Sequence, residues 1–357
     1  MKTNITQSNT NTAEAKVEVV KLGQDLHAAQ VTVVVQLDGS VPKHAQVIPI
    51  DAYLDWVKRL QAKYPQAQLH SCYEAGPCGY WLHRALTELG VTNLVVAPTN
   101  LSGRRKTDKR DARKLVEALE RYLHGNTDAF TKVTVPTAEQ EQRRGLPRHR
   151  AALVRERKRC VQQGCSLLLQ HGWRYDRKWR TAKVWPELEK RVPAWMRARL
   201  ADWKQAAELY DAQIAAVDQQ IAALAKELKL RAPKGLGLLT SLILLLETID
   251  WSRFKNRRQV GSYGGLCPSE FSTGQTRKQG GIDKHGNPRV RHALIEAAWR
   301  LLRYQPDYPP LKKVRAARDS RGRRKAIVAV ARRLAIDLWR LATGQATAEK
   351  LGLSYHA

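Results

Sequence analysis

The sequence has no apolar run long enough to cross a membrane and no cysteine pattern that would build a zinc site. Its longest apolar stretch, LGLLTSLILLLETI, is bounded by Lys234 and Asp250 and is shorter than the roughly 18 residues that a membrane span needs. The five cysteines are scattered and lack paired C-x-x-C or Cys/His spacings. The run therefore predicts a buried helix, and the cysteines predict free, mostly structural thiols.

Acidic residues are also scarce, with 33 Asp and Glu against 62 Lys and Arg and a formal net charge of +29. Such a field favours a polyanionic partner, most simply nucleic acid, over the small metabolites of an ordinary enzyme. The first 16 residues are polar and lack the apolar core of a secretion signal. We therefore expect a cytoplasmic protein that makes no membrane contact.

The predicted elements divide the chain into a leader and three segments of different composition. After a disordered-looking leader over residues 1–14, residues 15–136 predict strands and helices in the order βββαβαβα. This order is that of an RNase H-like (RuvC-like) domain. Residues 137–230 predict a basic helical segment, and residues 231–357 a mostly helical C-terminal domain. The predicted fold class is therefore α/β plus α.

Apolar residues at helical spacing mark the end of the middle segment. Those near a heptad seam are Leu209, Ile214, Val217, Ile221, Leu224 and Leu228. This spacing predicts an antiparallel hairpin or a dimeric coiled coil, and a helix packed on its own domain fits it as well.

Upstream of that seam, residues 143–180 are crowded with lysine and arginine. The cations that we assign to phosphate contacts are Arg155, Arg157, Lys158 and Arg159. The interleaved aromatic residues are Trp173, Tyr175 and Trp179. Nearly unopposed positive charge beside aromatic rings favours backbone contacts and base stacking over a merely solvated face.

Two aspartates interrupt the cationic stretch KTDKRDARK. Asp108 and Asp111, three residues apart, share one face of a predicted helix. Asp25 follows the first predicted strand and Glu74 ends the fourth, and in the RNase H-like topology these strand ends lie side by side, facing that helix. Oxygen donors of this kind suit Mg²⁺, so the four carboxylates predict a divalent-metal site. For the helix pair alone, acids favoured by the helix dipole are the competing explanation.

Cations around that pair predict contacts with DNA; the two that we assign are Lys106 and Arg110. Glycines mark a further candidate contact, because Gly235 and Gly237 lie in a predicted turn between helices, where backbone amides can bind phosphate. A turn that merely ends one helix is an equally good explanation of these glycines.

The stretch FSTGQTRKQGGIDKHGN predicts an irregular, basic, glycine-rich loop that carries a pair of hydroxyls, Ser272 and Thr273. Its composition predicts phosphate binding, and a hydroxyl there can attack phosphorus if a base or metal activates it. The residues that we assign to nucleic-acid contacts in it are Gly274, Arg277, Lys278 and Lys284.

Four segments together resemble the DEDD transposases of the insertion-sequence one-ten type, which are bridge-RNA-guided DNA recombinases. The segments are GQDLHAAQ, YEAGPCGYWLHRAL, VVAPTNLSGRRKTDKRDARKL and GGLCPSEFSTGQTRKQGGIDKHGNPRVRHALIEAAW. The resemblance covers nearly the whole chain. It implies a RuvC-like domain with metal ligands at Asp25, Glu74, Asp108 and Asp111, a coiled-coil segment, and a C-terminal transposase domain. It also implies donor and target DNA, a guide (bridge) RNA, a homo-oligomer such as a dimer or tetramer, and a prokaryotic, nucleoid-associated location.

The resemblance also implies a nucleophile, and here the chain departs from the pattern. Proteins of this type commonly have a nucleophilic serine directly before the glycine that corresponds to Gly274, whereas this chain has Thr273 there and Ser272 one residue earlier. Register favours Thr273, but a primary hydroxyl attacks more easily than a secondary one, so we favour Ser272. By the resemblance, the hydroxyl from a partner chain combines with the metal-bound acids, and a covalent phosphoryl-enzyme intermediate holds the broken DNA strand.

Two other functions fit parts of the sequence. A RuvC-like metal-dependent junction nuclease would use only the four acids and would form no covalent adduct with DNA. A non-catalytic nucleic-acid-binding protein would keep its function after all four acids were neutralised.

Overall fold

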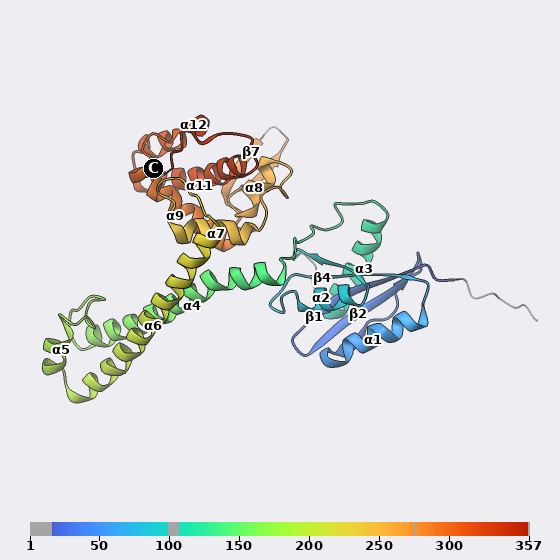
Figure 1. Ribbon diagram of the computed structural model, residues 1–357, viewed down its shortest axis with the longest axis horizontal. Coiled ribbons are helices and arrows are strands. Elements are labelled where there is room, and N and C mark those ends of the chain that lie inside the picture. The colour runs from blue at the N-terminus through green and yellow to red at the C-terminus, as the bar shows by residue number, and fades with distance from the viewer. Residues whose placement is uncertain (1–15, 99–106, 275, 356–357) are drawn as a thin grey trace, which may run out of the picture. The chain divides into compact units, whose positions relative to one another are not determined.

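The computed structural model describes residues 16–98, 107–274 and 276–355, with only the backbone of Arg277 and Gln279. The predicted leader over residues 1–14 and the predicted contact Lys106 lie outside this range. The chain forms two compact units, Met1–Val135 and Pro136–Ala357 (Figure 1). The first is a mixed α/β unit and the second is mostly helical. This arrangement agrees with the coarse fold class that the sequence predicts.

A five-stranded sheet forms the centre of the first unit. Its strands are β1 (Val19–Leu26), β2 (Gln30–Leu37), β3 (Gln46–Pro49), β4 (Gln68–Glu74) and β5 (Thr92–Val96), in the order β3-β2-β1-β4-β5. The pairs β1–β2 and β2–β3 are antiparallel, whereas β1–β4 and β4–β5 are parallel. The carboxyl ends of β1, β4 and β5 therefore meet at one edge of the sheet.

Helices cover both faces of this sheet. They are α1 (Ile50–Lys63), α2 (Trp81–Glu88) and α3 (Asp108–Leu123). Successive side chains of β2 point to opposite faces of the sheet, which explains why helices pack on both. Val33 packs in the cluster that contains Tyr53 of α1 and Leu82 of α2, whereas Val34 packs against Val116 of α3. The helix predicted over GPCGYWLHRALTELG is shorter than expected, because a turn with Gly79 at φ 68° precedes it.

Close backbone contact fixes α3 against β1. A Cβ atom at Gly23 would lie 2.2 Å from the carbonyl oxygen of Ala112 and 2.4 Å from the amide nitrogen of Val116. Only glycine leaves room for the helix backbone at this distance. The buried Lys21 of β1 also forms an ion pair with Glu120 near the other end of α3. Both contacts set where the first turn of α3 lies along β1.

Two long helices of the second unit form an antiparallel hairpin. They are α4 (Ala138–Gln170) and α6 (Ala194–Glu227), and the short helix α5 (Trp185–Arg191) lies between them in the chain. Ion pairs join Arg143, near the start of α4, to Glu227 at the end of α6, and Arg157, further along α4, to Asp211. The two helices therefore run in opposite directions. The prediction was wrong for Leu209, which is 58% exposed; its neighbour Tyr210 packs against the seam instead.

The aromatic residues between the long helices build a core. Trp179 is fully buried, packs with Leu168, Leu188 and Met196, and donates a hydrogen bond from Nε1 to the carbonyl oxygen of Val161 at 3.1 Å. The prediction that Trp179 stacks on bases was therefore wrong, because its ring lies inside the protein and no base can reach it.

The remaining elements pack around α9 and α11. They are α7 (Leu238–Thr248), α8 (Arg257–Tyr263), β6 (Pro268–Thr273), β7 (Thr276–Ile282), α9 (Pro288–Tyr304), η1 (Pro309–Leu311), α10 (Lys312–Arg315), α11 (Ser320–Ala342) and α12 (Ala348–Leu351). Leu294 and Leu301 of α9 contribute to one core with Ala331 and Leu334 of α11. Within the described ranges, no helix is both long and apolar enough to span a membrane.

The prediction of an irregular loop over residues 271–287 was wrong for its first part, which forms strands. The strands β6 and β7 form an antiparallel hairpin in which Ser272 pairs with Arg277 and Thr273 with Thr276. Residues that favour strands, Phe271 and the two threonines, flank a two-residue connection whose first residue, Gly274, has φ 55°. This connection suits a tight hairpin turn, because such turns require positive φ that glycine adopts without strain.

Candidate functional site

An acidic cluster lies at the edge of the sheet where the parallel strands end. Asp25 is near the end of β1, and Asp108 begins α3. The Nε2 atom of His27 lies 3.4 Å from Oδ2 of Asp25 and 3.4 Å from Oδ2 of Asp108. Ligand atoms of these three residues all lie within 4.8 Å of one another. The structure thus brings together two carboxylates and an imidazole that can hold a metal ion.

The fold explains why residues about 80 positions apart in the sequence meet here. Gly23 lets α3 lie directly on β1, so the first turn of the helix comes next to the end of the strand. Glu74 ends β4, one position beyond the pairing of Gln24 with Tyr73, which makes it the neighbour of Asp25 along the same edge. Among the described residues, however, neither Glu74 nor Asp111 has a ligand atom within the 4.8 Å group.

The electrostatics of the cluster favour a cation. Burial raises the pKa of Asp25, the nearby His27 lowers it, and the charges of Asp108 and Asp111 raise it again. Oδ2 of Asp111 is buried and accepts no hydrogen bond from the described residues. A buried carboxylate oxygen without a partner is costly, and a divalent cation would stabilise both it and the adjacent like charges. The carboxylate oxygens of the cluster suit Mg²⁺, which prefers hard ligands.

Sequence reasoning missed His27. The signal was the spacing D-x-H at the end of a strand, because side chains two residues apart point to the same side of a strand. An imidazole is an unusual ligand for Mg²⁺ and a common one for transition metals. Its distances of 3.4 Å to both aspartates also fit a residue that holds the two carboxylates in position. Arg110, the predicted DNA contact nearby, is exposed on the first turn of α3.

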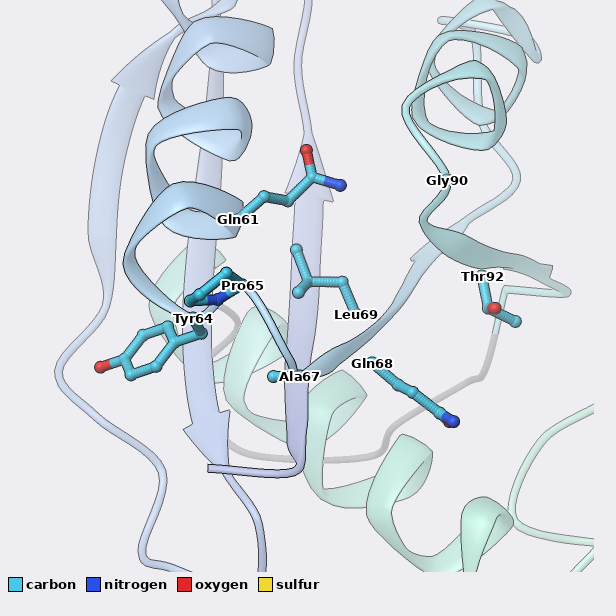
Figure 2. A pocket seen from close by; sticks show the side chains of 8 residues that line it. All are labelled: Gln61, Tyr64, Pro65, Ala67, Gln68, Leu69, Gly90 and Thr92. Atoms are coloured by element: carbon cyan, nitrogen blue, oxygen red, sulfur yellow. The ribbon is translucent and has the colours of Figure 1, made fainter. Parts of the chain in front are cut away.

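A hollow of about 330 Å³ lies at the opposite edge of the same sheet, where β4 and β5 begin (Figure 2). Its lining includes Gln61, Tyr64, Gln68 and Gly90, and contains no carboxylate, thiol or imidazole. In open α/β sheets, ligands bind beyond the carboxyl ends of the strands. The acidic cluster, and not this hollow, is therefore the candidate site of the first unit.

The second unit presents the predicted hydroxyl pair at the tip of the β6–β7 hairpin. Ser272 and Thr273 are both exposed. The Oγ atom of Ser272 donates a hydrogen bond to Oε1 of Glu270 at 2.9 Å, because residues two apart share one face of a strand. Of the predicted contacts around them, Lys278 and Lys284 are exposed. The side chain of the third assigned cation, Arg277, lies outside the described part.

A buried carboxylate ties the elements around this hairpin together. Glu247 of α7 is 1% exposed and accepts hydrogen bonds from Nε and Nη2 of Arg148 on α4, each at 2.8 Å, and from Nδ2 of Asn287 at 3.0 Å. The hydroxyl of Tyr263 donates to its backbone oxygen. Burial would raise the pKa of Glu247, but the hydrogen bonds from Arg148 and Asn287 hold it below its ordinary value. The charged carboxylate therefore links α4, α7 and the start of α9, and the backbone oxygen of the same residue links α8.

Many arginines of the predicted basic segment form ion pairs with carboxylates that the sequence did not indicate. Arginines of residues 143–180 paired with carboxylates of α6 or α7 are Arg143, Arg148, Arg150, Arg157 and Arg180. Of the four assigned cations, Arg155 and Lys158 are exposed and Arg159 pairs with Glu156 at 2.9 Å. The prediction of nearly unopposed charge was therefore wrong, because the acids come from other helices.

The two glycines predicted to contact phosphate have packing roles. Gly235 has φ 88°, and a Cβ there would lie 3.1 Å from Cβ of Tyr304. Gly237 is the residue directly before α7, and a Cβ there would lie 3.0 Å from Nη1 of Arg300. These contacts give both glycines a role in packing, although neither ends a helix, and their predicted contact with phosphate stays a prediction.

Comparison with known proteins gives a consistent result. Residues 228–311 match the family model described as transposase IS116/IS110/IS902 family. The chain is 34% identical over 298 residues to the putative transposase y4rJ of Sinorhizobium fredii, covering 75% of each chain. It is 30% identical over 277 residues to a probable family 20 transposase of Pseudomonas aeruginosa, covering 72% of this chain and 81% of that one. It is 27% identical over 320 residues to the transposase for insertion sequence element IS1111A of Coxiella burnetii, covering 83% and 84%.

Proposed function

Because the chain belongs to the IS116/IS110/IS902 transposase family, we propose that it cuts and exchanges DNA strands by phosphoryl transfer when an insertion sequence moves. The observation that carries this mechanism is the acidic cluster. Asp25 and Asp108 come together with His27 at one sheet edge, and Asp111 has a buried oxygen without a partner in the described part of the chain. Clustered carboxylates of this kind are suited to binding metal beside a phosphodiester.

We assign the metal site to Asp25, Glu74, Asp108 and Asp111 and expect Mg²⁺ in it. A divalent cation bound there would neutralise charge on the scissile phosphate and favour departure of the leaving oxygen. The sheet order and the packing of α3 on β1 support a RuvC-like identity for residues 15–136. The division of the remaining chain into a coiled-coil segment over 137–230 and a transposase domain over 231–357 is part of the same proposal.

Ser272 is the nucleophile in this proposal, and its hydrogen bond to Glu270 supports it over Thr273. A carboxylate that accepts this hydroxyl proton makes the oxygen a better nucleophile. The bond from Oγ to phosphorus forms as the bond to the leaving deoxyribose oxygen breaks. The serine proton passes to Glu270, and the leaving oxygen takes up a proton from solvent. The phosphoseryl link keeps the phosphodiester bond count constant until the strands exchange.

The acids and the hydroxyl belong to different units of the chain, which supports a role for oligomers. We propose that the acids of one chain act with Ser272 of a partner chain in a dimer or tetramer, guided by a bridge RNA. RNA that co-purifies with the native protein, identified by sequencing, would test the guide.

The metal site is tested by measuring the strand-exchange activity of the Asp108→Asn variant. We expect exchange to be lost while DNA binding stays within about twofold, because most of the affinity comes from the cationic surface. A matched control is Asp55→Asn. It removes an exposed aspartate of the same unit whose one ion pair within the described ranges is with Lys58, and it should leave exchange unchanged. Near-normal exchange by Asp108→Asn and Asp111→Asn in Mg²⁺ would contradict the assignment.

A further inference from the structure

Another segment of the second unit carries a denser group of lysines and arginines without acidic partners than α4 does. Residues 312–325, KKVRAARDSRGRRK, contain eight lysines and arginines and one aspartate. All eight cations are exposed. In the described part of the chain, none of them lies within ion-pairing distance of a carboxylate. The aspartate, Asp319, caps α11 and accepts a hydrogen bond from the amide of Gly322 at 2.6 Å. This segment therefore presents positive charge that no carboxylate among the described residues compensates.

The charge continues along the exposed face of α11 as a row. Arg321, Lys325, Ala329 and Arg333 recur every four residues, which places them on one side of the helix. All four are exposed, whereas the opposite side packs into the core. From Arg321 to Arg333 the helix rises by about 18 Å, the length of roughly five phosphates along one strand of duplex DNA. A straight row of this length fits a nucleic-acid backbone better than a small anion.

A pocket of about 650 Å³ lies at the far end of the row. Its cationic lining residues are Lys312, Lys313, Arg333, Arg340 and Lys350. The pocket shares Lys312 and Lys313 with the 312–325 segment, so the two surfaces are continuous.

A buried carboxylate positions the arginines of this pocket. Asp337 is 1% exposed and accepts hydrogen bonds from the hydroxyl of Tyr308 at 2.7 Å and from Nε of Arg333 at 3.0 Å. The nearest atom of Arg340, Nη1, lies 3.8 Å from it. Because Asp337 engages Arg333 through Nε, the terminal nitrogens of that guanidinium remain available for a phosphate, which arginine binds in a bidentate manner.

We propose that residues 312–325, the exposed face of α11 and this pocket form a binding surface for the phosphate backbone of duplex DNA. We take DNA as the partner from the proposed function. The surface supplies affinity that does not depend on base sequence, because it contacts phosphates and releases their counterions. It lies outside every residue that we assign to cutting.

A charge-matched pair of variants tests this surface. The first replaces four of its cations by glutamine: Lys312, Lys313, Arg321 and Lys325. The control replaces four exposed cations of the same unit that also have no ion pair in the described residues: Lys183, Arg197, Lys226 and Lys229. Both variants lose the same net charge. Affinity for a labelled DNA duplex is measured in EDTA across a series of salt concentrations, and circular dichroism checks the fold.

We expect the slope of log K against log salt to fall by about 3.6 in the first variant, about 0.9 for each lost phosphate contact. The control should change the slope by less than about 1. Equal changes in both variants would overturn the proposal, because they would show an effect of net charge alone. A loss of affinity for structured RNA with unchanged DNA binding would also overturn it.

Binding in EDTA separates this surface from the chemistry of strand exchange. If Asp108→Asn abolishes exchange while the first variant binds DNA with an unchanged slope, the proposed function stands and the surface is wrong. If the first variant loses slope while Asp108→Asn exchanges strands normally, the surface stands and the metal site is wrong.

Discussion

Gly23→Ala should weaken the first unit more than any other glycine-to-alanine change in it for which the contacts are known. The new methyl group would lie 2.2 Å and 2.4 Å from backbone atoms of Ala112 and Val116. The backbone of α3 must then withdraw from β1 by about 1 Å to restore van der Waals contact. Overpacking of this kind costs about 1–3 kcal/mol, which lowers the melting temperature of a unit of this size by several degrees.

The same displacement should impair the acidic cluster, because α3 carries Asp108 and Asp111. We expect Gly23→Ala to need more Mg²⁺ than the wild type for half-maximal strand exchange. Gly39→Ala is the matched control, since a Cβ there meets nothing within 4 Å and should change stability by less than about 0.5 kcal/mol. Thermal unfolding and a Mg²⁺ titration of exchange are the assays. Indistinguishable results for the two variants would refute the view that Gly23 positions α3 on β1.

Three further predictions concern buried groups. Asp111→Asn should abolish the rise in melting temperature that Mg²⁺ causes in the wild type, without lowering the melting temperature in EDTA; a preserved Mg²⁺ effect would remove Asp111 from the site. Glu247→Gln should lower the free energy of unfolding by about 3–5 kcal/mol, because it leaves the charge of Arg148 without its partner. Arg159→Gln, at an exposed ion pair, should lower it by less than about 1 kcal/mol. Equal losses in thermal unfolding would contradict a stabilising role for the Glu247 network. Trp179→Ala should cost about 3–5 kcal/mol and leave DNA affinity of the folded protein unchanged; a specific loss of single-strand binding would restore the stacking interpretation.

Local patterns were sufficient to predict the sheet of the first unit. The many β-branched residues of β1 and β2 indicate strands without any knowledge of their partners, and the strand ends put Asp25 and Glu74 at one edge. The cluster itself needed tertiary contacts. The close approach between β1 at Gly23 and the backbone of α3 is a tertiary contact, and a glycine at position 23 does not indicate which helix packs there.

The basic helix shows why charge could not be assigned from composition. The partner of Arg148 is 99 residues away and that of Arg157 is 54 residues away. Packing of α4 against α7 and α6 brings Glu247 and Asp211 to these arginines, and the order of charges along the sequence does not show that packing. The exposed segment over 312–325 is similar in composition, and only the structure shows that none of its cations forms an ion pair with a described carboxylate.

The hydroxyl pair illustrates the same limit at shorter range. Glycine-rich composition predicted an irregular loop, but cross-strand pairing of Ser272 with Arg277 makes a hairpin. The strand then places Ser272 on the same face as Glu270, a contact that an irregular loop would not define.

Mapping the covalent link between protein and DNA tests the central claim most directly. A suicide DNA substrate would trap the intermediate in Mg²⁺, and nuclease trimming followed by peptide mass spectrometry would locate the attached nucleotide. The account predicts a DNA remnant on Ser272 in the wild type, none with Ser272→Ala, and none with Asp108→Asn. A remnant on Thr273, or strand exchange without any adduct, would contradict it.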